Sequence, residues 1–90
     1  MNAHQLKGVF PLIWCMKKRD DKKELKDFGK QVRVCRQEQA MTQSALAYEM
    51  DVEISQISRI ERGLINPTLL TIIRLASGLR VSISRLFDYA

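Results

Sequence analysis

Apolar and polar residues follow a helical period from Leu25 onward. Apolar side chains recur there at spacings of three, four and three residues: Leu25, Phe28, Val32 and Cys35. This is the spacing of one buried face of an amphipathic helix. The positions between them are polar: Lys26, Lys30, Arg33 and Gln37. We therefore predict a first helix over about Lys23–Gln39.

Two shorter helices follow, separated by a tight break. Thr42 is a good N-cap for a helix over Gln43–Met50. Asp51, which tolerates the left-handed backbone conformation, ends that helix. A third helix is predicted over Ile54–Arg62, with Ile57 and Ile60 facing inward and Gly63 as a left-handed cap; two helices joined in this way can place the second in the major groove of DNA.

The C-terminal third predicts two more helices. Asn66–Pro67–Thr68 is a turn followed by an N-cap, because proline disfavours helix in the residue before it. A fourth helix ending near Gly78 is marked by apolar residues: Leu69, Ile72, Ile73 and Ala76. Ser82 caps a last short helix, whose residues Ile83, Leu86 and Phe87 return to the core. The predicted fold is all-α, a compact five-helix bundle.

Charge favours an anionic partner, but its distribution weakens that argument. The 90-residue chain, long enough for one domain, has a net charge of +5 and a pI near 9.6. Between Lys17 and Arg36 nine Lys and Arg residues face four acids, whereas from Gln37 to Ala90 five Arg residues face six acids. The positive excess therefore lies before the two-helix segment, not in it.

Residues 1–24 are predicted to be an N-terminal extension, and residues 25–90 the domain. An apolar run, Gly8–Met16, precedes a mixed charge run without periodicity. The extension is either a poorly ordered leader, an arm that reaches a DNA groove, or a dimerisation segment; Met16 is also a possible start. The apolar run is too short for a membrane span, and its basic cluster follows it, unlike that of a signal peptide. With Cys15 and Cys35 in no metal-like spacing, we expect a cytoplasmic protein with reduced thiols.

The residue inventory argues against an enzyme. The only histidine is His4, in the extension. The domain therefore has no histidine to act as the base of a catalytic nucleophile or as a metal ligand. The sequence also contains no glycine-rich phosphate-binding loop. No metal and no cofactor are expected.

The segment from Phe28 to Asp88 resembles the XRE (Cro/cI-like) helix-turn-helix family. The motifs that carry the resemblance are Met41–Thr42–Gln43 with Leu46–Ala47, then Ile57–Ser58–Arg59–Ile60–Glu61–Arg62–Gly63, Asn66–Pro67–Thr68–Leu69, Leu75–Ala76 and Leu86–Phe87. The resemblance implies a lambda-repressor-like DNA-binding domain. It also implies a transcriptional regulator that binds double-stranded DNA as a homodimer on a palindromic operator. Of the two modes of regulation, repression is the one expected.

The resemblance assigns roles to individual residues. Base contacts are expected from the outward positions of the third helix: Ile54, Ser55, Gln56 and Arg59. Gln56 suits adenine, Arg59 suits guanine, and Ile54 suits a thymine methyl group. Contacts with the DNA backbone are expected from Gln43, Arg62, Asn66 and Thr68. For the four base-contacting residues the alternative is an ordinary solvated residue, and for Gln43 it is a plain first residue of the helix. Arg36 and Glu61 are expected to form a partly buried ion pair that fixes the angle of the recognition helix.

Some positions depart from the family pattern. Family members usually carry glycine at the positions of Ala40, Asp51 and Arg80, so Ala40 and Arg80 would be strained if those turns keep their usual geometry. An early helix end at Gly78 would relieve the strain at Arg80. Glu53 stands where a Ser or Thr N-cap is usual, and it caps less well.

The homodimer surface implied by the family involves the last helix and the loop before it. Here that surface would present Leu79, Val81, Ile83, Phe87 and Tyr89. The alternative function is a protein-interaction module, such as an antitoxin-type partner that touches DNA only within a complex. The near-neutral body of the domain keeps this alternative open.

Overall fold

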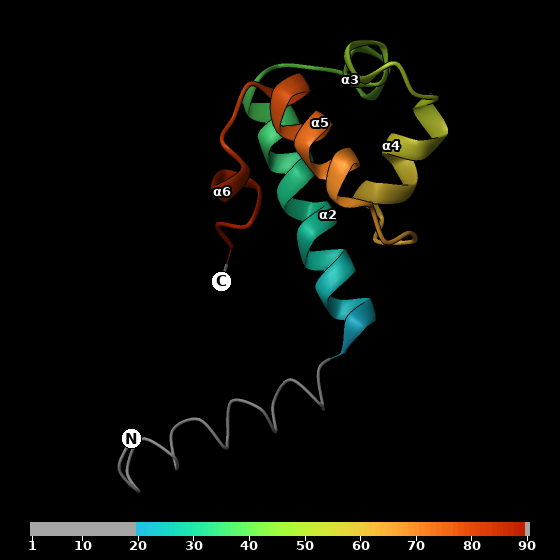
Figure 1. Ribbon diagram of the computed structural model, residues 1–90, viewed down its shortest axis with the longest axis vertical. Helices are drawn as coiled ribbons and strands as arrows, with labels where there is room; N and C mark the ends of the chain where they lie inside the picture. Colours follow the sequence, from blue (N-terminus) through green and yellow to red (C-terminus); the bar gives the residue numbers. More distant parts are fainter. Residues whose placement is uncertain (1–19, 90) are drawn as a thin grey trace, which may run out of the picture.

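All secondary structure in the part that the computed structural model describes, residues 20–89, is helical (Figure 1). The elements are α2 (Asp21–Glu38), α3 (Gln43–Met50), α4 (Ile54–Glu61), α5 (Leu69–Leu79) and α6 (Ile83–Leu86). The predicted all-α five-helix bundle is confirmed. The predictions for the first nineteen residues, including Cys15 and the Met16 start, lie outside the described residues.

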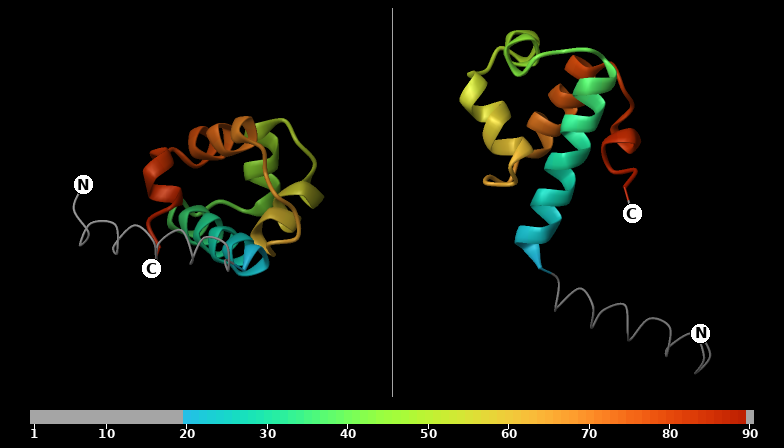
Figure 2. Two further views of the ribbon diagram at one scale, coloured as in Figure 1. Left: turned by 60° about the horizontal axis from the view of Figure 1, so that its bottom comes forward. Right: turned by 180° about the vertical axis from the view of Figure 1, so that it is seen from behind.

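The long helix α2 forms the spine of the bundle. Helices α4 and α6 lie on opposite sides of it, while α5 runs alongside it and α3 closes one end (Figures 1 and 2). One apolar core joins the helices: Phe28, Val32, Cys35, Leu46, Ala47, Met50, Ile57, Ile60, Leu75, Ala76, Leu79 and Leu86. No helix within residues 20–89 is long and apolar enough to cross a membrane.

Side-chain caps set where the helices begin. The hydroxyl groups of Thr42, Thr68 and Ser82 each accept a hydrogen bond from the backbone N–H three residues later, at 3.0, 3.2 and 3.3 Å. These three predicted N-caps are confirmed. Asp20 caps α2 in the same way through Lys23 N–H at 3.2 Å, so α2 begins at Asp21, two residues before the predicted start.

The predicted left-handed turns are present. Ala40, Asp51 and Arg80 have φ angles of 55°, 55° and 59°, and Gly63 has a φ of 72°. The predicted early end at Gly78 is wrong, because α5 continues through this residue to Leu79. Arg80 therefore carries the left-handed conformation itself. The helix α4 ends at Glu61 with Arg62 as its C-cap, one residue earlier than predicted.

Exposure corrects the predicted core of the last two helices. Ile83 and Phe87 were expected to return to the core but are 45% and 48% exposed, and only Leu86 of that set is buried. On α5, two residues that mark the helix in the sequence, Leu69 and Ile73, are 70% and 42% exposed. The inward face of α5 consists of Ile72, Leu75, Ala76 and Leu79. Leu79 is fully buried, so its predicted place on a dimer surface is wrong: the helix continues past Gly78 and turns this side chain into the core.

Candidate nucleic-acid interface

Helices α3 and α4 are joined by a three-residue turn. Asp51 ends α3 in the left-handed conformation, and its N–H bonds back to the carbonyl of Tyr48 at 3.1 Å. The N–H of Val52 bonds to the carbonyl of Ala47 at 3.0 Å, and together the two bonds close the end of α3. Glu53 then precedes α4 without a side-chain cap hydrogen bond, as expected of a poor N-cap. In the first turn of α4 the N–H of Gln56 bonds to the Glu53 carbonyl at 3.0 Å, and no cap side chain accepts from the N–H groups before it.

The two faces of α4 have different tasks. Ile57 and Ile60 are fully buried and hold the helix on the core. Ser55, Gln56 and Arg59 lie away from that buried stripe, whereas Ile54, three residues before Ile57, lies at its edge in the first turn of the helix. Ile54 and Arg59 are exposed, while Ser55 and Gln56 are half-buried. The structure thus leaves one short face of α4 able to meet a partner.

A guanidinium–carboxylate pair joins α2 to the end of α4. Arg36 Nε lies 2.6 Å from Glu61 Oε2, and Arg36 Nη2 lies 3.0 Å from Glu61 Oε1. The third guanidinium nitrogen donates to the carbonyl of Met41 at 2.8 Å, in the turn before α3. The side chains of Arg36 and Glu61 are only 12% and 4% exposed. This hydrogen bonding raises the pKa of Arg36 above its usual value, so the guanidinium stays charged.

Gln43, the first residue of α3, also contacts this carboxylate. Its side-chain amide nitrogen donates to Glu61 Oε1 at 3.1 Å. The Glu61 carboxylate, at the end of α4, therefore bonds to the last turn of α2 and to the first residue of α3. A glutamine amide has a second N–H, so this contact still leaves a donor for a phosphate.

Backbone contact places α4 against α2, which the sequence reasoning missed. An added Cβ at Gly29 would lie 2.4 Å from the carbonyl oxygen of Ile60 and 2.6 Å from that of Glu61. One at Gly63 would lie 2.7 Å from the backbone of Lys26. The glycine in the middle of a predicted helix was the available signal, since glycine there costs helix stability unless close packing requires it.

Two further contacts hold α6 on α2. Gln31 is buried, and its amide donates to the carbonyl of Arg85 at 2.8 Å. Arg85 in turn donates to both oxygens of Glu38, at 2.8 and 3.0 Å. The sequence offered no signal for these pairs beyond a polar residue at an inward position.

The other predicted backbone-contacting residues surround the loop between α4 and α5. Arg62, Asn66 and Thr68 are all exposed. Arg62 Nε donates to the carbonyl of Ser58 at 3.3 Å, which lays its side chain along α4. Thr68 uses its hydroxyl oxygen to cap α5.

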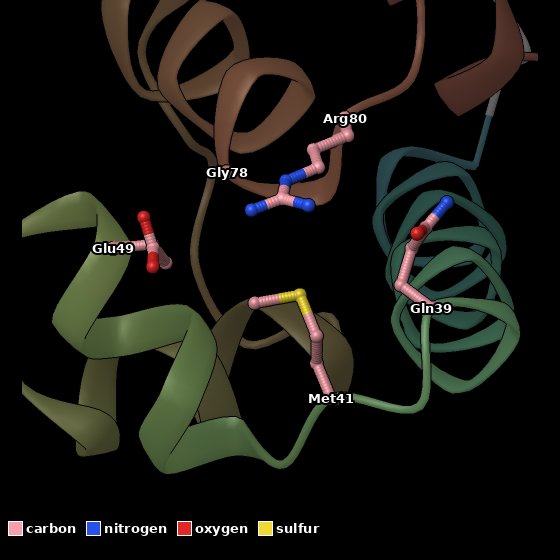
Figure 3. A pocket seen from close by; sticks show the side chains of 5 residues that line it. All are labelled: Gln39, Met41, Glu49, Gly78 and Arg80. Atoms are coloured by element: carbon pink, nitrogen blue, oxygen red, sulfur yellow. The ribbon is translucent and has the colours of Figure 1, made fainter.

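A hollow of about 150 Å³ lies between the ends of α3 and α5 (Figure 3). Figure 3 shows the Arg80 side chain extending over it, between Glu49 and Gln39. Gly78 lines the hollow because α5 approaches α3 closely there, within 3.0 Å of Leu46 Cδ1 for an added Cβ. The volume is below the range of ordinary small-molecule sites. We therefore interpret this hollow as a packing feature beside the Arg80 turn and not as a ligand site.

The turn between α3 and α4, the anchored inner face of α4 and its polar outer face define a helix-turn-helix domain. A helix-turn-helix family model, HTH_3, matches residues 32–86, more than half of the chain. The chain belongs to this family and is a DNA-binding regulator of the XRE type.

Solved structures of similar proteins have the same fold. The restriction-modification controller protein C.AhdI from Aeromonas hydrophila is 31% identical, with a TM-score of 0.71 over 72% of this chain and 98% of that one. The controller protein C.Esp1396I is 33% identical, with a TM-score of 0.66 over 71% of this chain and 84% of that one. An HTH_3 family transcriptional regulator from Vibrio cholerae is 29% identical, with a TM-score of 0.71 over 76% of this chain and 38% of that one. The comparison with curated proteins gives no match.

Proposed function

We propose that this protein represses transcription by binding a specific double-stranded DNA sequence as a homodimer. The observation that carries the proposal is the division of α4 into two faces. Buried residues and the Glu61 carboxylate hold the helix in place, and a separate polar face remains accessible. A helix held in this way can enter the major groove with its N-terminal end first.

Direct readout of bases is assigned to four residues of α4: Ile54, Ser55, Gln56 and Arg59. Arg59 is exposed, and its guanidinium has the geometry to bind guanine O6 and N7 together. The amide of Gln56 can do the same with adenine N6 and N7. Each such pair is worth about 1–3 kcal/mol of discrimination.

Contacts with the DNA backbone are assigned to Gln43, Arg62, Asn66 and Thr68. Gln43 starts α3, where the free N–H groups and the helix dipole favour a phosphate. Because Gln43 also bonds to Glu61, a phosphate bound there acts on the residue that anchors α4. Docking on the backbone and the position of the reading face are thereby linked.

A homodimer supplies enough contacts for a unique site. Four reading residues in one protomer contact only a few base pairs, and two-fold symmetry doubles them on a palindrome. The similar protein C.Esp1396I has been crystallised as a tetramer in complex with its natural 35 base-pair operator. The dimer surface we propose is built around Ile83 and Phe87, 45% and 48% exposed, with the partly buried Val81 and Tyr89 beside them.

Selection of bound sequences from random DNA tests this proposal. We expect a palindrome whose half-site spacing reports the dimer. Arg59→Ala should then relax specificity at one position of each half-site, at a cost of about 1–3 kcal/mol. Arg62→Ala should weaken binding to all sequences alike and lower the salt slope by about one. Equal effects of both variants on every sequence would contradict the assigned roles.

A second candidate is a protein-interaction module that touches DNA only within a complex, as an antitoxin-type partner does. The observation that favours it is charge: between Thr42 and Gly63 two arginines face four acids. A salt titration separates the two candidates. A DNA binder loses affinity linearly with the logarithm of salt concentration. No DNA binding at low salt, with a stable complex with a neighbouring gene product, would establish the second.

Either function is non-enzymatic in our proposal, and neither uses a metal or a cofactor. Among residues 20–89 no group of three or more His, Cys, Asp and Glu side chains is placed to hold a metal ion. We propose the cytoplasm as the place of action, at the nucleoid when the protein is bound to its operator.

A further inference from the structure

An apolar patch lies on the loop between α4 and α5 and on the first turns of α5. It combines an exposed leucine of the loop, Leu64, with three exposed side chains of α5: Leu69, Leu70 and Ile73. Leu69 and Leu70 are 70% and 64% exposed, and Leu64 is 59% exposed. Positions 69 and 70 lie four and three residues before Ile73, so these three side chains share one side of α5. Single exposed apolar residues are ordinary, but a cluster of this kind marks an interaction surface.

This patch is separate from the proposed dimer surface. The loop that carries Leu64 lies on the α4 side of the bundle, and α6 lies on the opposite side of α2 and α5 (Figures 1 and 2). A homodimer built on Ile83 and Phe87 therefore leaves the patch to another occupant.

The patch lies close to the point where the first nineteen residues join the domain. Gly63, next to Leu64, packs against the backbone of Lys26. Lys26 follows Asp20 by six residues, which is about 9 Å along a helix at 1.5 Å per residue. A chain that leaves Asp20 and folds back by about that distance reaches the level of Leu64.

The chain before Asp20 has both the composition and the reach for this. Residues 9–14 read VFPLIW, an apolar run without charge. Six peptide units join Trp14 to Asp20, and fully extended they span about 20 Å. The basic residues Lys17, Lys18 and Arg19 belong to this connection and not to the apolar run.

We propose that residues 9–14 pack back on the patch of Leu64, Leu69, Leu70 and Ile73 of the same chain. The apolar run then covers the most exposed leucines of residues 20–89. It also tethers the start of α2 to the loop between α4 and α5. The proposal does not depend on the DNA sequence recognised or on the homodimer.

Trp14 makes the proposal directly testable, because it is the only tryptophan of the chain. In the folded full-length protein we expect blue-shifted Trp14 emission and weaker acrylamide quenching than in the urea-unfolded chain. Both should be independent of protein concentration, because the contact is within one chain. Leu70→Lys and, separately, Ile73→Lys should shift the emission toward that of exposed tryptophan.

Val34→Lys is the matched control, since Val34 on α2 is 42% exposed, as is Ile73. It should leave Trp14 emission unchanged. Far-UV circular dichroism checks that each variant stays folded, and all three positions are at the surface. Exposed Trp14 emission in the wild type would overturn the proposal. So would a blue shift that appears only as concentration rises, which indicates a second copy, or one that neither patch variant changes.

Discussion

Glu61→Ala is the sharpest test of how α4 is held. The Glu61 side chain is 4% exposed and accepts from two nitrogens of Arg36 and from the amide of Gln43. Removing it leaves a guanidinium that is 12% exposed with only the carbonyl of Met41 as a partner among these contacts. Breaking a buried pair in this way costs about 3–5 kcal/mol.

That cost is large for a domain of this size. About 70 ordered residues give a total stability of about 4–10 kcal/mol at 0.05–0.15 kcal/mol per residue. At about 4–8 °C per kcal/mol, Glu61→Ala should lower Tm by at least about 12 °C. The double variant Arg36→Met with Glu61→Leu removes both charges and should recover much of the loss.

The assay combines urea unfolding with DNA binding by fluorescence anisotropy. Glu38→Ala is the matched control, because Glu38 pairs with Arg85 at 2.8 Å but is 53% exposed. Such an exposed pair is worth less than about 1 kcal/mol. In Glu61→Ala the loss of binding should follow the unfolded fraction. A Glu61→Ala protein that unfolds at the wild-type midpoint yet fails to bind DNA would refute this reasoning and make Glu61 a recognition residue.

Three further outcomes follow from backbone and thiol geometry. Gly29→Ala should destabilise the domain by about 1–3 kcal/mol in urea unfolding, because the new Cβ meets carbonyl oxygens of α4. Gly78→Ala should destabilise it much less, because its Cβ meets the movable end of the Leu46 side chain at 3.0 Å. Arg80→Gly should raise the free energy of unfolding by up to about 1 kcal/mol in a urea titration, since glycine relieves a φ of 59°; an unchanged free energy would refute strain there. Burial raises the pKa of the Cys35 thiol, so its contribution to stability is present below the unfolded value of about 8.5 and falls as pH rises above it. The stability difference between pH 7 and pH 10 should therefore be smaller in Cys35→Ala than in the wild type.

The helices could be predicted from sequence because their ends are set locally. A hydroxyl such as that of Thr42 or Ser82 caps the N–H three residues later, whatever the rest of the chain does. The exposure of Leu69 could not be predicted in this way. Its apolar character fits the helical period, but burial depends on whether another element covers that side of α5.

In the candidate site, too, some contacts could be predicted from the sequence and others could not. Resemblance located Arg36 and Glu61, and the structure pairs them at 2.6 Å. The bond from Gln43 to the same carboxylate depends on where α3 starts relative to the end of α4, which no local pattern encodes. The burial of Leu79 was missed although the period encodes it: Leu79 follows Leu75 by four residues and Ala76 by three, and so lies on the buried face of α5.

The position of α4 and its reading residues are physically independent. Its tilt is set by the contact of Gly29 with two backbone carbonyls, by the Glu61 carboxylate and by the buried face of the helix. None of these involves the four residues assigned to the bases. If Ile54 and Arg59 contact bases as we propose, substitutions there should change which bases are favoured at little cost in stability, because neither side chain is in the core. A change at Gly29 or Glu61 lowers stability, and so reduces binding to every operator alike. Specificity in this domain can thus be altered through its outer face while the framework stays the same.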